Sequence, residues 1–173
     1  IEEEVDRLNN TIVNYLALGS RQELKMEAVR PAEIIKDIVS QFEHEAKKRQ
    51  VVLETNLHEP VSIMGNRSAL RQAFFNIIIN AFQAQSQGGM VSITSIVKKI
   101  KQRDLLVLEF NDTGPGIPKG LRKKIFEPFF STKDKGSGLG LYIVKNIIEQ
   151  HKGTVDLESK QGQGTKVILS FPL

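Results

Sequence analysis

The 173-residue chain contains no cysteine and no tryptophan. The lack of cysteine excludes a disulfide framework, cysteine-ligated zinc, iron–sulfur clusters and thiol catalysis, and it is compatible with a reducing cytoplasm. No apolar run approaches the roughly 18 residues of a membrane-spanning helix, and we expect no signal peptide. Apolar residues at 40% and charged residues at 25% are typical of a globular protein, and the length suggests one domain with some residues to spare.

The chain also has little excess charge of either sign. Its formal net charge is +4, from 24 basic and 20 acidic residues. A nucleic-acid-binding surface would need clustered basic residues and a recognisable motif as well as a basic isoelectric point. We find no such motif, so an ordinary solvated surface is favoured. Salt-dependent DNA binding would be the signature of the less favoured alternative.

Residues 1–18 have the pattern of an amphipathic helix. Apolar residues recur at alternating steps of four and three, as in a helix that packs on other helices: Ile1, Val5, Leu8, Ile12 and Tyr15/Leu16. Two heptads do not separate a helix that rests on its own domain from one that belongs to a bundle. Residues 21–30 are predicted to be a polar linker that ends before Pro31.

From Pro31 onward, helical and strand patterns alternate. Helices are predicted at 31–49, 68–85 and 139–151, and strands at 51–57, 61–64, 91–99, 104–111, 154–159 and 165–171. Residues 112–140 are rich in Gly, Pro and Lys and are far longer than a usual connection of about 4–6 residues, which indicates a functional or a disordered loop. Strands grouped with helices between them indicate a two-layer α/β sandwich.

Two asparagines, Asn76 and Asn80, lie one turn apart on one face of the helix predicted at 68–85. Asparagine is a mediocre helix former, so its repetition beside an apolar stripe invites a functional explanation. An amide oxygen can enter the coordination shell of Mg²⁺, which prefers few protein ligands together with phosphate oxygens and water. Solvent-facing or mutually bonded amides are the alternative, and for the pair taken alone they are favoured.

Two glycine-rich segments follow. The first, 112–117, reads Asp-Thr-Gly-Pro-Gly-Ile directly after a strand, where glycines let the backbone approach a ligand and an aspartate can select adenine through its amino group. The second, 136–141, opens the last long helix, whose N-terminal amides favour phosphate. It matches neither a Walker loop nor a dinucleotide-binding fingerprint. Lys133 and Lys135 could reach phosphate oxygens or could simply solubilise the loop.

The order of these motifs resembles the catalytic and ATP-binding domain of bacterial sensor histidine kinases, whose fold is shared with gyrase, the Hsp90 chaperone and MutL. The matching boxes are Asn76-x-x-x-Asn80-Ala81, Asp112-x-Gly114-x-Gly116-Ile117, Phe126-Glu127-Pro128-Phe129-Phe130, Gly136-x-Gly138-x-Gly140-Leu141 and Gly164-Thr165. The resemblance implies an α+β two-layer sandwich with a mixed, mostly antiparallel sheet packed on three helices (the Bergerat fold) over residues 31–173. It also implies that residues 1–20 are the end of the second helix of the dimerisation and phosphotransfer hairpin, a four-helix-bundle element.

The resemblance assigns roles to individual residues. Asp112 would bind the adenine amino group, supported through water by Thr165, and Asn80 would ligate Mg²⁺. Asn76, at the catalytic position, would lie beside the phosphates of ATP. The remaining ATP-site residues implied are Gly114, Gly116, Ile117, Lys133, Gly136, Ser137, Gly138, Leu139, Gly140 and Leu141. The aromatic residues implied as anchors of a mobile lid are Phe126, Phe129 and Phe130, and we expect at least one of them to pack in the core instead.

The implied function is that of an ATP-dependent protein-histidine kinase. Hydrolysing members of the fold carry a glutamate general base where this chain has Asn76, so bound ATP is expected to be kept for transfer. None of His44, His58 and His151 suits the acceptor, which we expect on a helix upstream of Ile1. Two smaller departures from the family pattern are Asn66, where many members have Asp, and Ala84, which cannot stack on adenine.

The implied partners are the hairpin of a homodimer, a response regulator receiver domain, and inhibitor proteins acting on the hairpin or lid, with no nucleic acid. The implied location is a cytoplasmic domain, with the whole protein a candidate for membrane anchoring. An anti-sigma-factor-type serine kinase and a nucleotide-gated pseudokinase are the alternatives. Residues 117–136 hold six basic and two acidic residues, a net charge of +4 that equals that of the whole chain. We therefore interpret the excess charge as a basic lid over one nucleotide.

Overall fold

The computed structural model describes residues 25–58, 60–85, 88–100, 102–133 and 136–173. The helix predicted at 1–18 lies outside these ranges. The described elements are β1 (Glu27–Val29), α2 (Pro31–Arg49), β2 (Val51–Asn56), β3 (Ile63–Gly65), α3 (Arg67–Gln83), β4 (Gly89–Ile100), β5 (Arg103–Asp112), the 3₁₀ turn η1 (Lys124–Phe126), α4 (Gly140–Gln150), β6 (Thr154–Ser159) and β7 (Thr165–Pro172). No helix among them combines the length and the apolarity of a membrane span.

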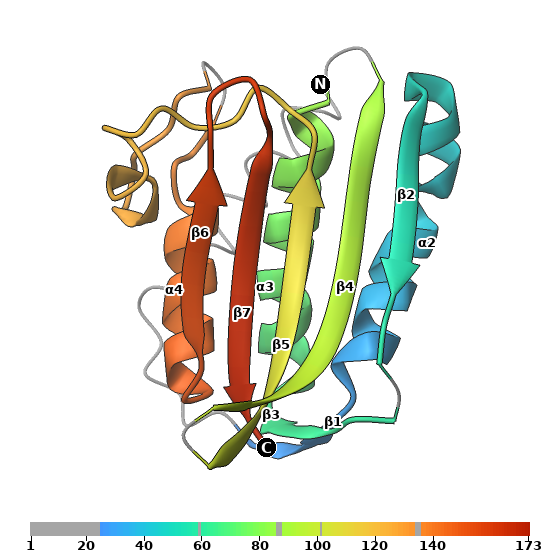
Figure 1. Ribbon diagram of the computed structural model, residues 1–173, viewed down its shortest axis with the longest axis vertical. Helices are drawn as coiled ribbons and strands as arrows, with labels where there is room; N and C mark the ends of the chain where they lie inside the picture. The colour runs from blue at the N-terminus through green and yellow to red at the C-terminus, as the bar shows by residue number, and fades with distance from the viewer. Residues whose placement is uncertain (1–24, 59, 86–87, 101, 134–135) are drawn as a thin grey trace.

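The main sheet has five strands in the order β2-β4-β5-β7-β6, and α2, α3 and α4 cover one of its faces (Figure 1). Strand β2 runs parallel to β4, whereas the other neighbouring pairs are antiparallel. The parallel pair is joined through β3 and α3, the kind of long crossover that parallel strands require. The predicted two-layer sandwich with a mixed, mostly antiparallel sheet on three helices is therefore confirmed.

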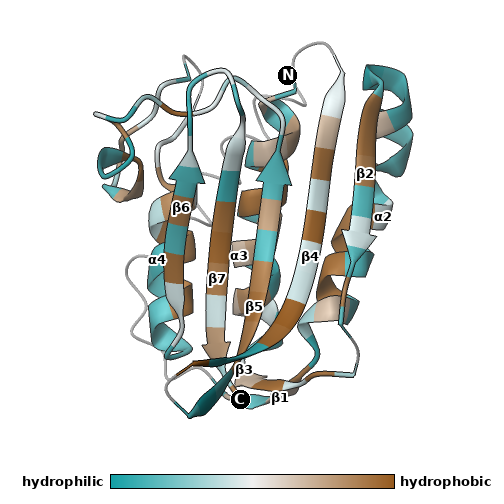
Figure 2. Cartoon of the chain, in the orientation of Figure 1, coloured by the Kyte–Doolittle hydropathy of each residue, from teal (hydrophilic) through white to brown (hydrophobic). Residues whose placement is uncertain are grey.

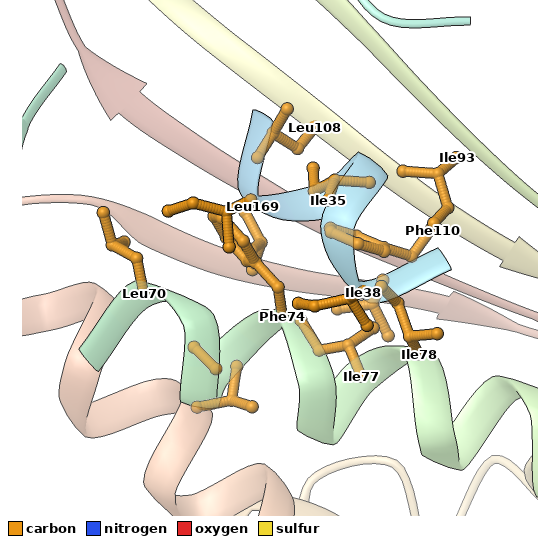
Figure 3. Packing of buried hydrophobic residues seen from close by; sticks show 14 of the residues in the cluster. Ile35, Ile38, Leu70, Phe74, Ile77, Ile78, Ile93, Leu108, Phe110 and Leu169 are labelled. Carbon is orange, nitrogen blue, oxygen red and sulfur yellow. The ribbon is translucent and has the colours of Figure 1, made fainter. Parts of the chain in front are cut away.

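The hydrophobic core lies between the sheet and the helices. In β5, which is apolar over much of its length (Figure 2), Leu106, Leu108 and Phe110 occupy alternate positions and belong to the core cluster, while Val107 on the other face is also buried. From α3, Phe74 projects into this core (Figure 3), and its ring centroid lies 6.0 Å from that of Phe110 and 6.5 Å from that of Phe171. Rings at these spacings add favourable edge interactions to the burial of apolar area.

Helix α2 has the bounds that the sequence predicts, 31–49, and its residues explain this agreement. Pro31 occupies the first turn, where its missing N–H leaves no bond unmade. Ile34, Ile35 and Ile38 form the buried face of the helix. The helix ends at Gln50, which adopts the left-handed conformation of a helix C-cap at φ 57°.

The range 21–30, which the sequence predicts to be a linker, contains a strand. Residues Glu27–Val29 form β1, which pairs antiparallel with β3 in a separate two-stranded sheet. Val29 is 3% exposed and belongs to the core cluster. A three-residue strand whose partner lies more than thirty positions away has no local sequence signal, which explains why this segment was expected to be a plain connection.

Helices α3 and α4 are tied together where α3 begins and α4 ends. The Oδ1 atom of Asn66 accepts from the N–H of Ala69 at 2.9 Å and so caps α3. The N–H of Asn66 itself donates to Nε2 of the buried His151 at 2.9 Å. The other ring nitrogen, Nδ1, lies 2.6 Å from the carbonyl of Ile147, so the ring carries its proton there and accepts at Nε2. Asn66 thus serves as the N-cap of α3.

Candidate functional site

One open cleft of about 1790 Å³ lies between α3, the end of β5, the segment 113–139 and the start of α4. Every residue that the sequence assigns to the ATP site lines this cleft: Asn76, Asn80, Asp112, Gly114, Gly116, Ile117, Lys133, Gly136, Ser137, Gly138, Leu139, Gly140, Leu141 and Thr165. Residues far apart in the chain therefore meet at a single site. Of the aromatic residues predicted to anchor the lid, Phe129 and Phe130 line the cleft.

The α3 wall of the cleft presents the two predicted asparagines. The Asn76 amide nitrogen donates to the carbonyl of Gly140 at 3.3 Å, which joins the middle of α3 to the first turn of α4. The Asn80 amide oxygen accepts from the Lys133 ammonium at 3.3 Å. The two amides are therefore not bonded to each other; each faces a different part of the opposite wall.

Asp112 lies at the end of β5 with its carboxylate partly buried. Its Oδ1 accepts from the N–H of Gly114 at 2.8 Å. Burial raises the pKa of the carboxyl above its ordinary value, and N–H groups of Gly114 and Thr165, the charge of Lys133 and a bond from Gln85 oppose this rise only in part. A partly desolvated carboxylate at the floor of a cleft can accept a hydrogen bond from an exocyclic amine.

Gln85 is a site residue that the sequence reasoning did not identify. Its side chain is 3% exposed, its nitrogen donates to the carbonyl of Ala81 at 3.1 Å, and its oxygen accepts from the Thr113 hydroxyl at 3.1 Å. A polar residue at the end of a helix gives no sequence signal of burial. Its place directly beside Asp112 depends on how α3 meets β5, which only the fold determines.

Gln83 is the second missed residue. Its amide oxygen accepts from the Lys133 ammonium at 2.8 Å. A signal for it did exist, because Gln83 follows Asn80 by three positions and Asn76 by seven, which places all three on one face of the helix. Partial desolvation lowers the pKa of the Lys133 ammonium, and the attraction of Asp112 opposes this effect.

Two glycines of the loop are required by close backbone contacts. Gly116 has φ +68°, and a Cβ atom there would collide with the carbonyl of Lys160. Gly138 has φ +69°, and its Cβ would collide with the backbone of Phe129. Phe129 itself has φ 65°, an uncommon conformation for an aromatic residue. The segment that precedes α4 is therefore packed closely on the aromatic part of the loop.

None of the three lid phenylalanines is a core residue. Phe129 is 67% exposed, Phe126 and Phe130 are half-buried, and the residue of this stretch that packs inward is Ile125. The expectation that at least one phenylalanine packs in the core is therefore wrong. Ile125 takes this place because η1 turns it inward toward α4.

The side-chain oxygens in the cleft suit a magnesium ion whose coordination shell is completed mainly by phosphate oxygens and water. Among the described residues, no three His, Cys, Asp or Glu side chains gather to hold a metal. The Asn80 oxygen already contacts one cation, the Lys133 ammonium. One neutral amide oxygen suits Mg²⁺ when phosphate oxygens and water complete the shell. Asn80 is therefore the residue that would hold it.

The sequence matches a known family profile. A profile described as "Histidine kinase-, DNA gyrase B-, and HSP90-like ATPase" matches residues 65–173. Sporulation kinase C of Bacillus subtilis is 33% identical over 172 residues, which are 98% of this chain and 39% of that protein. Sensor histidine kinase ZraS of Escherichia coli K12 is 32% identical over 171 residues, which are 98% of this chain and 36% of that protein. The chain thus spans well under half the length of these relatives.

Solved structures give the same result. The catalytic domain of histidine kinase ThkA has a TM-score of 0.73 and 28% identity, and the match covers 86% of this chain and 96% of that one. Full-length ShkA in complex with AMPPNP shows the same fold, with a TM-score of 0.82 at 24% identity over 98% of this chain and 36% of that one. The chain belongs to the family of histidine kinase-, DNA gyrase B- and HSP90-like ATPases, and its fold is that of a histidine kinase catalytic domain.

Proposed function

We propose that this domain binds ATP with Mg²⁺ and donates the γ-phosphate to a histidine on a dimerisation and phosphotransfer hairpin. The observation that supports this most directly is the composition of the cleft: Asp112 lies on its β5 side, and Asn76 and Asn80 face the first turn of α4. The carboxylate, which can accept from the amine of a base, therefore lies apart from the helix end that can bind phosphate. This arrangement suits a nucleotide that lies along the cleft.

Asp112 is the proposed adenine-selecting residue. Its carboxylate can accept from the amino group of adenine, whereas the carbonyl of guanine at the same position would be repelled. Thr165 can support the base through water, and its hydroxyl is 3.0 Å from that of Ser159. Ala84 also lines the cleft and offers a small apolar contact in place of an aromatic platform.

The triphosphate is proposed to lie against the segment 136–141. The unpaired N–H groups at the start of α4 and the positive end of the helix dipole favour anions there. Lys133 supplies a positive charge from the loop. Asn80 would hold Mg²⁺, which neutralises phosphate charge when bound. The basic loop residues would raise the local concentration of the nucleotide.

Asn76 is the proposed residue beside the transferring phosphate. An amide can orient phosphate oxygens, but it has no basic carboxylate with which to activate water. Its hydrogen bond to the carbonyl of Gly140 fixes the Asn76 side chain at the N-terminal end of α4. Because asparagine cannot act as a base, bound ATP would be protected from hydrolysis. Phosphoryl transfer requires mainly the positioning of its reactants, which Asn76 could assist.

The acceptor is proposed to belong to another part of the protein. His151 is buried and uses both ring nitrogens in hydrogen bonds. His44 lies in α2 and His58 follows β2, and neither lines the cleft. We infer that the partners are the hairpin of a homodimer and, for relay, the aspartate of a response regulator receiver domain.

Trans-phosphorylation tests this proposal. The domain is mixed with γ-labelled ATP and a separate hairpin polypeptide that carries an acceptor histidine, and acid-labile, base-stable label on the hairpin is measured. We expect label that requires Mg²⁺ and disappears with Asn80→Ala. Mg²⁺-dependent ATP binding without label on any competent hairpin would instead support a regulatory pseudokinase. Acid-stable label on a serine would support the serine kinase alternative.

A further inference from the structure

Two amide oxygens on α3 converge on a single cation, the Lys133 ammonium. Lys133 Nζ donates to Gln83 Oε1 at 2.8 Å and to Asn80 Oδ1 at 3.3 Å. Asn80 and Gln83 are three positions apart and share a face of α3. Lys133 comes from the loop before α4, so these two bonds join the loop to the opposite wall of the cleft.

The backbone around Lys133 is itself organised to present the side chain. The N–H of Lys133 donates to the Ser131 hydroxyl at 3.0 Å, and its carbonyl accepts from the N–H of Gly136 at 3.1 Å. The side chain therefore extends from a compact turn and reaches α3 as a defined bridge. The charge of Asp112 also attracts this ammonium.

We propose that Gln83 is a positioning residue that holds the Lys133 ammonium on Asn80 while the site is free of nucleotide, so that Lys133 and the divalent cation compete for the Asn80 oxygen. This inference rests on the proposed function, in which Asn80 holds Mg²⁺. When the metal takes Asn80, the ammonium is displaced toward the phosphates. Lys133 thus has two successive partners, the α3 amides and the nucleotide.

A neutral amide at position 83 suits this exchange. An uncharged acceptor holds an exposed ammonium only weakly, so the bridge can be broken when the nucleotide binds. A carboxylate there would hold the lysine more tightly and would also repel the triphosphate. An apolar side chain would provide no acceptor, and the loop would lose its contact with α3.

The competition is tested with Mn²⁺ added to the protein at a saturating AMPPNP concentration, since phosphate oxygens must complete the metal's shell, by following the paramagnetic broadening of the Asn80 side-chain amide signal. Since the exposed hydrogen bond is worth about 1 kcal/mol, Lys133→Met is expected to lower the Mn²⁺ concentration at half-broadening about fivefold. The matched control is Lys124→Met, which removes the same charge from an exposed position of η1. An equal shift in both variants, or no shift in either, would overturn the proposal.

The role of Gln83 is tested by hydrogen exchange of residues 129–133 in the nucleotide-free protein. Gln83→Met and Lys133→Met are each expected to speed exchange severalfold, and the double variant is expected to be no faster than either one. Gln163→Met, at an exposed turn, should match the wild type. Additive effects, or an unchanged rate in Gln83→Met, would refute the bridge. If the wild type binds no adenine nucleotide, the proposed function and the competition fail together, but the coupling between Gln83 and Lys133 can still be measured.

Discussion

Replacement of Asp112 by Asn separates nucleotide recognition from fold stability. The substitution keeps the size of the side chain and an oxygen that can accept from the N–H of Gly114, now 2.8 Å from Oδ1. It removes the negative charge of the carboxylate that is proposed to accept from the adenine amino group. Hydrogen bonds to charged groups contribute about 1.5–3 kcal/mol, so we expect the affinity for an ATP analogue to fall about 10- to 150-fold. Since an amide can also donate, the preference for adenine over guanine should fall as well.

The same substitution has an opposite effect on stability. Burial raises the pKa of Asp112 in the folded protein above its ordinary value of 3.8, so the folded state takes up this proton more readily than the unfolded state. The ionised carboxylate therefore costs stability above the raised pKa, and this cost disappears as the pH falls below 3.8. Asp112→Asn should be the more stable protein at neutral pH, and the two proteins should converge in acid.

Calorimetric titration with AMPPNP and GMPPNP and thermal unfolding across the pH range measure both effects. Asp156→Asn, which makes the same change at an exposed position of β6, is the matched control and should alter neither. Unchanged affinity and base preference in Asp112→Asn would refute the assignment of adenine to Asp112. A stability difference that persists below pH 3.8 would contradict the desolvation argument.

Three further substitutions test the loop, the core and the helix junction. Gly138 has φ +69°, and Gly138→Ala would push a Cβ atom into the backbone of Phe129, so AMPPNP binding should weaken about tenfold. The control Gly120→Ala, which has open space around it, should bind AMPPNP normally. Phe74→Ala should lower the free energy of unfolding in urea by about 3–5 kcal/mol, and a loss below 1 kcal/mol, well under that range, would contradict its place in the core. His151→Ala leaves the N–H of Asn66 without its acceptor and should cost about 1–3 kcal/mol in the same assay; wild-type stability would show that the junction contributes nothing.

The long periodic elements could be predicted from the sequence because their signals are local. The helix expected at 31–49 has these bounds, since a proline marks its start and an apolar face its extent. The strands expected at 91–99 and 104–111 differ from β4 and β5 by one or two residues at each end, where fraying makes bounds uncertain. The short β1 was missed because its stability comes from β3 and the core.

The site could be predicted at positions where the sequence places a polar residue against an apolar pattern, because such a residue calls for a chemical explanation. Asn76, Asn80 and Asp112 are polar residues set against apolar patterns, and they meet in one cleft. Gln83 and Gln85 remained unnoticed because glutamine is ordinary on a helix surface. Their importance depends on the loop and the strand packed against them, which are contacts between distant segments.

The hydrogen bond between His151 and Asn66 has a mechanical consequence. Together with the bond between Asn76 and Gly140, it joins α3 to α4 at two separate points along the helices. Sliding of one helix along the other would break both hydrogen bonds at once, so the two helices form a rigid side of the cleft. Admission and release of a ligand would then depend on the described loop segments that line the cleft and not on movement of the two helices.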